Sequence, residues 1–144
     1  MDPGAHTIHV ERRAQICAFE ALLASSPLAH VGDTEWMPLT HRFGDGIYLR
    51  EIRIPAGTLL TGKIHRHAHP VFLMEGTAQV FTEAGGYDTL QGPWCAISPR
   101  AVKRAIYAVT DCWWITVHVT ASQDLEEIER QVIAPSYRAL EEGR

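Results

Sequence analysis

The feature that most limits the fold of this chain is a series of short β-rich stretches between Ile47 and Thr120. Residues that favour strands (Val, Ile, Thr, Tyr and Trp) alternate there with Gly and Pro breakers. The stretches are IYLREIRI, GTLLTGKIH, VFLME, AQVFTE, YDTLQ, WCAIS, RAIYAV and CWWITVHVT. Strands this short and this regularly spaced predict an all-β sandwich or barrel. Glu83-Ala84-Gly85-Gly86 predicts a hairpin turn within it, because glycine adopts positive φ without a steric clash.

Helical patterns flank the β-rich region on both sides. Apolar residues at helical spacing predict a short amphipathic helix over residues 11–24, and Gly and Pro make residues 25–46 rich in loops. After the strands, Ser122 is a candidate N-cap for a helix with acidic residues in its first turn, interrupted at Pro135. We expect a helical N-terminal extension over residues 1–40, a barrel over residues 41–120, and a C-terminal helix and tail over residues 121–144.

Composition narrows the classes of protein to consider. With 144 residues, 46% of them hydrophobic and 21% charged, the chain is expected to form one ordinary soluble domain. The net charge is −4 and the basic residues are scattered, which argues against nucleic-acid binding. No apolar run is long enough to span a membrane, and the first residues do not resemble a signal peptide. Cys17, Cys95 and Cys112 form no close pair, so we expect a reducing, cytoplasmic location without disulfides.

The histidines carry the clearest functional signal. The sequence has eight, and His65, His67 and His69 alternate along a short segment. Alternate residues of an extended strand face the same side, so these imidazoles can converge on one point. Neutral imidazole suits several divalent transition metals, and we expect one ion, with Zn, Fe(II) or Ni as candidates. The alternative interpretation is an exposed basic patch without a metal.

The segment VFLMEGTAQVFT, which contains Gly76, resembles the first motif of the cupin superfamily. That motif has a glycine, an HxH pair, a glutamate three or four residues later, and a closing glycine. With Gly76 as the closing glycine, His69 stands at the glutamate position, His65 at the second histidine and Lys63 at the first. The stretch HRFGDGIYLREIRIPAGTLLTGKIH resembles the entry strand and first motif of small single-domain cupins from phage and proteobacterial genomes.

The second cupin motif, P-x-G-x-x-H, has a counterpart in Pro99-Arg100-Ala101-Val102-Lys103-Arg104. Ala101 replaces the glycine there, and Arg104 replaces the histidine ligand. His118, on the last predicted strand, is the candidate to fill the vacated ligand position if it faces the interior. The expected metal ligands are therefore His65, His69 and His118, with His67 in reserve. The alternative for His118 is a solvent-facing side chain.

Four more residues are candidates for contacts with a ligand or with the imidazoles. Glu51 is a candidate acceptor for an imidazole N–H, or else a strand charge paired with Arg50 or Arg53. Lys63 and Arg104 would bring positive charge to the metal and attract an anion, or else extend to the barrel rim. Tyr48 is a candidate pocket residue, although aromatic residues on strands more often belong to a core or a subunit interface.

The resemblance implies a double-stranded β-helix barrel that forms a homodimer. It also implies a metal-dependent enzyme, with dioxygenase, lyase and isomerase chemistry among the options, acting on a small anionic oxygen-bearing molecule. Two alternatives stay open. One is a module that binds or senses a small molecule or metal without turnover. The other is a degenerate cupin kept for a structural role, which would bind no metal.

Overall fold

A computed structural model describes residues 3–29 and 34–144 of the chain. One long helix, α1 (Pro3–Ala24), precedes the strands. The strands of the barrel are β1 (Leu39–Gly44), β2 (Ile47–Ile54), β3 (Leu59–Thr61), β4 (Ile64–His65), β5 (His69–Glu75), β6 (Thr77–Thr82), β7 (Gly86–Gln91), β8 (Trp94–Ser98), β9 (Ala105–Ala108) and β10 (Cys112–Val119). The all-β prediction is confirmed, and β2 and β8 match the predicted stretches residue for residue.

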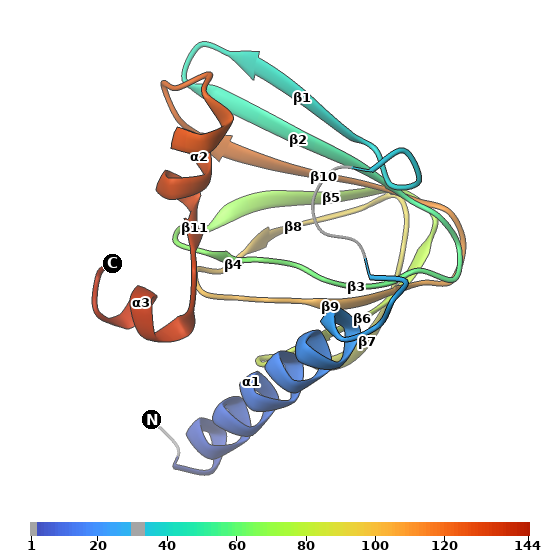
Figure 1. Cartoon of the computed structure of the whole chain (residues 1–144), viewed down its shortest axis with the longest axis vertical. Helices are drawn as coiled ribbons and strands as arrows, with labels where there is room; N and C mark the ends of the chain where they lie inside the picture. Colours follow the sequence, from blue (N-terminus) through green and yellow to red (C-terminus); the bar gives the residue numbers. More distant parts are fainter. Residues whose placement is uncertain (1–2, 30–33) are drawn as a thin grey trace.

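Two antiparallel sheets form the body of the described residues (Figure 1). The five-stranded sheet has the order β1-β2-β10-β5-β8, and the four-stranded sheet has the order β3-β9-β6-β7. β10 is the central strand, because it pairs with β2 on one side and β5 on the other. The last strand of the barrel therefore lies beside the segment that carries the histidine cluster.

Alternation along the strands separates an interior face from an exterior face. On β10 the interior residues include Trp114 and His118, whereas Val119 is 90% exposed. The largest apolar core fills one part of the interior and comes from both sheets. Its buried members are Ile52, Ile54, Val71, Leu73, Ala78, Val80, Ile106, Ala108, Cys112 and Trp114.

The helix α1 lies against the outside of the four-stranded sheet (Figure 1). Ion pairs attach it there: Arg13 pairs with the buried Glu83, and Glu20 pairs with the buried Lys103 at 2.7 Å. The helix ends where the sequence predicts but begins at Pro3 rather than near residue 11. Its first turns contain few apolar residues, so hydrophobic periodicity alone did not reveal them.

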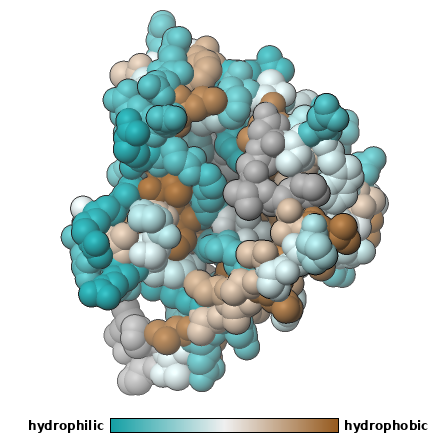
Figure 2. Space-filling model, viewed as in Figure 1, coloured by the Kyte–Doolittle hydropathy of each residue, from teal (hydrophilic) through white to brown (hydrophobic). Residues whose placement is uncertain are grey.

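The C-terminal segment consists of α2 (Leu125–Val132), β11 (Ile133–Ala134) and α3 (Tyr137–Glu141), and it covers one end of the barrel (Figure 1). Its outer surface is mostly hydrophilic (Figure 2), whereas Ile128, Val132, Ala134 and Leu140 are buried in small apolar clusters. The N-cap of α2 is Asp124, whose carboxylate accepts hydrogen bonds from two backbone N–H groups. The prediction of Ser122 as the cap is therefore wrong by two residues.

Strand β1 was not expected, because residues 25–46 were interpreted as loops. Its polar residues conceal the strand, but it pairs with β2 along its whole length across a turn that contains Asp45 and Gly46. Gly46 has a φ of 75°, which an Asp-Gly turn requires. The expected boundary between residues 40 and 41 thus falls inside β1. The predicted hairpin turn between β6 and β7 is confirmed. Among the described residues, no helix is long and apolar enough to cross a membrane.

Candidate metal centre

Three histidines from three strands meet inside the barrel. His65 comes from β4, His69 from the start of β5 and His118 from near the end of β10. Their ring centroids lie 4.1 Å apart for His65–His69, 4.8 Å for His69–His118 and 5.3 Å for His65–His118. One potential ligand atom from each ring lies within 4.8 Å of the other two. These are the three residues that the sequence predicts as ligands.

Strand pairing explains why these rings meet. β5 and β10 are neighbours in the five-stranded sheet, so interior residues at adjacent ends of the two strands come together. His118 lies opposite Tyr48 of β2, and His69 lies opposite Ser98 of β8. Both histidines are buried, with 6% and 3% of their surface exposed. The solvent-facing alternative for His118 is wrong.

The hydrogen bonds of the rings leave nitrogen atoms available for a ligand. His69 Nδ1 lies 3.2 Å from the backbone carbonyl oxygen of His67, to which it donates. The proton therefore sits on Nδ1, and the lone pair of Nε2 is buried without a hydrogen-bond partner. His65 Nδ1 is also buried without a partner. Buried polar atoms are almost always paired, so two orphaned nitrogens in one cluster point to a missing partner.

Burial and mutual repulsion keep the imidazoles uncharged. Desolvation lowers the pKa of His65 to about 3, and positive charge on His69, His118, Arg104 and Arg50 would oppose its protonation further. The pKa of His118 falls to about 4 for the same main reason, and that of His69 is lowered as well. Neutral imidazole is the form that binds metals, so protons do not compete for this site near neutral pH.

The donor set fits a divalent transition metal. Zinc holds imidazole nitrogens at about 2.1 Å, which places two of them about 3.4 Å apart in tetrahedral geometry, so a pair at the 4.8 Å limit would have to close by roughly 1.4 Å. The Thr116 hydroxyl, 3.0 Å from His118 Nε2, helps to fix the orientation of one ring. His67, the reserve ligand, is exposed and outside the cluster, and contributes only its carbonyl oxygen.

Arg104 lies beside the cluster and mostly within the protein. Its Nη1 donates to the Ser98 hydroxyl at 3.0 Å, and Ser98 is the strand partner of His69. The guanidinium lowers the pKa values of both His65 and His69, and desolvation lowers its own pKa. The loop before it contains Ala101, whose φ of 72° is the conformation that favours the glycine of the cupin motif.

Lys63 and Glu51 do not reach the histidines. Lys63 is exposed and forms an ion pair with Glu129 of α2, so it lies at the rim. Glu51 is buried on the exterior face of β2, where its carboxylate pairs with Arg42 and accepts a hydrogen bond from Trp113 Nε1 at 3.0 Å. Glu51 lies three residues after Tyr48 on β2. Because this is an odd number, the two side chains point to opposite faces of the sheet.

Tyr48 lies next to the cluster, together with a histidine that the sequence did not assign to it. The Tyr48 ring stacks near His118 with centroids 6.0 Å apart, and its hydroxyl lies 2.6 Å from His41 Nδ1. Burial raises the pKa of Tyr48. His41 belongs to β1, so the missed strand also hid this contact. The alternation of Leu39, His41 and Phe43 is the signal that could have revealed it.

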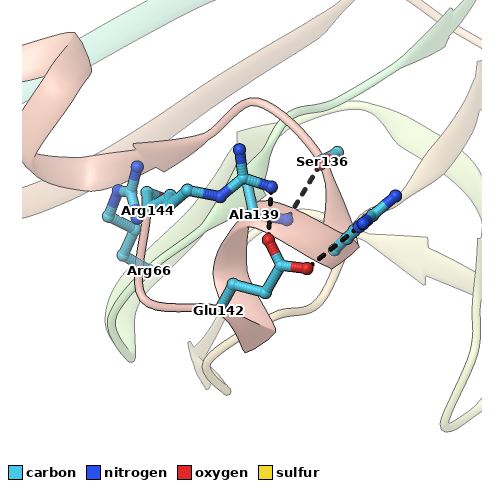
Figure 3. Close-up of polar contacts among 6 residues, drawn as sticks. Arg66, Ser136, Ala139, Glu142 and Arg144 are labelled. Carbon is cyan, nitrogen blue, oxygen red and sulfur yellow. Dashed lines mark hydrogen bonds and ion pairs between the residues drawn. The ribbon is translucent and has the colours of Figure 1, made fainter.

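The C-terminal segment holds the strand that carries His65. β11 pairs with β4, and the side chain of Arg66 donates to the Ile133 carbonyl at 3.0 Å and to the Arg144 carbonyl at 2.6 Å. Figure 3 shows Arg66 beside Arg144, whose guanidinium pairs with Glu142. The backbone N–H of Arg66 also donates to Val132 at 2.8 Å. A segment outside the expected barrel therefore fixes one candidate ligand.

Comparisons with known proteins bear on the fold. No family model matches the sequence, and no curated protein matches it significantly. Among solved structures, an RmlC-like cupin with a double-stranded β-helix fold from Methanocaldococcus jannaschii aligns with 64% of this chain and 87% of its own, at a TM-score of 0.50 and 11% identity. The cupin domain of Cnp3 from Schizosaccharomyces pombe aligns over 70% of this chain and 74% of its own length. The TM-score is 0.51 and the sequence identity is 16%. The chain has the cupin fold.

A third similar structure is ectoine synthase from P. lautus, with a TM-score of 0.56 and 17% identity over 73% of this chain and 79% of the synthase. Identities this low speak for the fold alone, because one fold hosts many activities. The chemistry of this chain therefore depends on its own residues. The predicted double-stranded β-helix with helices at both ends is confirmed.

Proposed function

We propose that this cupin is a metal-dependent enzyme that acts on a small, anionic, oxygen-bearing molecule. His65, His69 and His118 would hold one divalent transition metal, with Zn, Fe(II) and Ni as the candidates. The observation that carries the proposal is the convergence of three neutral imidazoles, two of which keep buried nitrogen atoms without a hydrogen-bond partner. Three protein ligands leave coordination positions open, which is the arrangement of catalytic rather than structural sites.

The bound ion would act as a Lewis acid toward the oxygen atoms of the substrate. The chain itself supplies the positioning. Three strands and the C-terminal segment fix the imidazoles, and the Arg104 and Arg50 guanidinium groups make the surrounding potential positive. Positive charge around an interior site favours anionic substrates. Tyr48, whose ring lies beside His118, and His41 provide a hydroxyl–imidazole pair for moving a proton.

A second candidate function is a module that binds or senses a small molecule without turnover. One observation favours it: among the described residues, no carboxylate contacts the three histidines, so a carboxylate general base is missing there. The two functions share the metal and the anion. They differ in whether Tyr48 and His41 are needed for more than binding.

The test is the metal content of protein purified without a histidine tag. We expect about one equivalent of a transition metal in the wild type and a large loss in His65→Ala, His69→Ala and His118→Ala. His67→Ala is the matched control, because this histidine is a sequence neighbour with an exposed side chain, and it should keep the metal. Equal metal content in all five proteins, or none in the folded wild type, would overturn the proposal.

We also propose a cytoplasmic homodimer in which two copies pair through the outer face of the five-stranded sheet. Strand alternation places apolar side chains on that face, including Phe72, Ile97 and Val117, and Ile97 is 64% exposed. Contiguous exposed apolar residues are typical of protein interfaces. Sedimentation velocity should show a dimer for the wild type and a monomer for Ile97→Glu. A monomeric wild type would contradict this assembly.

A further inference from the structure

Arg104 is a largely buried positive charge for which the described residues provide no negative partner. None of their ion pairs involves Arg104. The hydrogen bond that its side chain makes is to the neutral hydroxyl of Ser98. A guanidinium has five N–H donors, so most of them remain for another acceptor. Burying a charge without a counter-charge is costly, and proteins rarely keep such a group without a use for it.

The other buried charges of the described residues are all neutralised. Glu51 pairs with Arg42, Glu83 with Arg13, and Lys103 with Glu20. Lys103 is the immediate neighbour of Arg104, yet it points to α1 and has a carboxylate partner. The missing partner of Arg104 is therefore a property of its own position and not of the loop as a whole.

That position is next to the metal centre. Ser98, which accepts the hydrogen bond from Arg104, is fully buried and is the strand partner of His69. The backbone holds the loop on both sides, because Ala101 N–H donates to the His65 carbonyl at 2.9 Å and Arg104 C=O accepts from Gly62 at 2.8 Å. The guanidinium is close enough to oppose protonation of both His65 and His69.

We propose that Arg104 and Ser98 form a carboxylate-binding subsite beside the three histidines, so that the ligand of this cupin is a small carboxylate. The inference rests on the proposed function and specifies its substrate class. The planar fork of the guanidinium matches the two oxygens of a carboxylate. The Ser98 hydroxyl accepts from Arg104 and keeps its own hydrogen to donate. A carboxylate held there places the adjoining atoms of the ligand at the metal.

Burial and shape favour a carboxylate over a phosphate. A carboxylate presents two coplanar oxygens to the guanidinium fork and carries one negative charge rather than about two, so placing it beside the fully buried Ser98 costs less desolvation than placing a phosphate there. Arg50, on the interior face of β2, adds positive charge on the side of His118. Ligands with a second negative group should therefore bind more tightly than simple monocarboxylates.

The experiment measures binding of malonate, acetate, inorganic phosphate and the neutral propane-1,3-diol by calorimetry, with metal-free and Zn-loaded protein. The proteins are the wild type, Arg104→Gln and Arg104→Lys, with Arg100→Gln as the matched control on the exposed part of the same loop. Metal content and thermal unfolding are recorded for each. Arg104→Lys keeps the charge without the fork, and it replaces Arg104→Gln if that variant does not fold.

We expect the wild type to bind malonate more tightly than acetate and not to bind the diol. Arg104→Gln should weaken malonate binding roughly 10- to 100-fold, as expected for losing a charge-assisted hydrogen bond, while it keeps its metal. Arg100→Gln should match the wild type. Malonate binding unchanged in Arg104→Gln, or phosphate binding stronger than any carboxylate, would overturn the inference and leave the metal site intact. Failure of the folded wild type to bind zinc would instead overturn the proposed function.

Discussion

Ile133 of β11 lies directly opposite His65 of β4 in a two-residue antiparallel ladder. The pairing joins the C-terminal segment to the strand that supplies one of the three candidate metal ligands. Arg66 strengthens the junction, because its side chain donates to the carbonyl groups of Ile133 and Arg144. The position of the His65 ring thus depends on residues at the very end of the chain.

Removal of the Arg66 side chain should therefore weaken metal binding although Arg66 is not a ligand. We expect Arg66→Ala to lower the metal affinity roughly tenfold, which is the usual effect of losing a residue that orients a ligand. Arg138→Ala is the control, since Arg138 lies in the same segment but forms an exposed ion pair with Glu142. Competition with a chromophoric chelator measures both affinities. Equal affinities for the two variants would contradict the role given to Arg66.

Ala101→Gly should stabilise the protein. Ala101 has a φ of 72°. This left-handed conformation costs a residue with a Cβ about 1–2 kcal/mol, and glycine avoids that cost. Glycine also makes the unfolded chain more flexible, which offsets part of the stabilisation. We expect a net gain of about 1 kcal/mol in urea unfolding of the metal-free protein. Ala84→Gly, in the exposed turn after β6, should give no gain. Destabilisation by Ala101→Gly would show that the packing of the Ala101 methyl group contributes more to stability than relief of the left-handed conformation does.

The metal-free protein should lose stability as the pH falls from 7 to 5. The folded-state pKa values of His65 and His118 are about 3 and about 4, well below the ordinary value of 6.5. Below pH 6.5 the unfolded chain binds protons that the folded chain does not, so the free energy of unfolding decreases in this window. Carboxylates titrate mostly below pH 5 and contribute little to it.

His118→Gln provides the comparison for this pH dependence, because glutamine is polar but does not titrate. Urea unfolding at half-unit intervals between pH 7 and 5 should give a shallower slope for His118→Gln than for the wild type. Excess zinc should also protect the wild type, since the metal stabilises the folded state to which it binds. Identical slopes for the two metal-free proteins would show that His118 is not desolvated.

Glu51→Gln should affect stability and leave the metal unchanged. The buried carboxylate accepts hydrogen bonds from Arg42 and Trp113 on the exterior face of the sheet. Loss of its charge should cost about 1–2 kcal/mol of unfolding free energy, as is usual for buried charged hydrogen bonds. Glu75→Gln, which alters an exposed ion pair with Arg53, should cost little. A reduced metal content in Glu51→Gln would mean that the carboxylate acts on the histidines after all.

The sequence was sufficient to predict the barrel and the three converging histidines. The β-rich stretches carry their own alternation, so the placement of His118 on one face and Val117 on the other follows from a period of two. Choosing the interior face was harder, because apolar residues occupy both faces of β10. The resemblance to the cupin motifs decided in favour of His69 and His118, and their arrangement in the structure agrees with it.

What the sequence could not reveal depends on pairings between distant segments. Nothing in the local pattern shows that Ile133 pairs with His65, since a two-residue strand has no periodicity to detect. The same limit concealed β1 and with it the contact between His41 and Tyr48. For Lys63 the sequence left both the metal and the rim open, because position in a motif does not fix the direction of a long side chain. The ion pair with Glu129 of α2 places it at the rim.

The central claim, that three imidazoles bind one metal ion inside the barrel, is tested most directly by anomalous diffraction from crystals of untagged protein. Data collected above and below the absorption edge of the bound metal should show one strong peak within about 2.1 Å of a nitrogen of each of His65, His69 and His118. A peak at His67 or at the His41–Tyr48 pair, or no peak between the three rings in protein supplied with metal, would contradict the account.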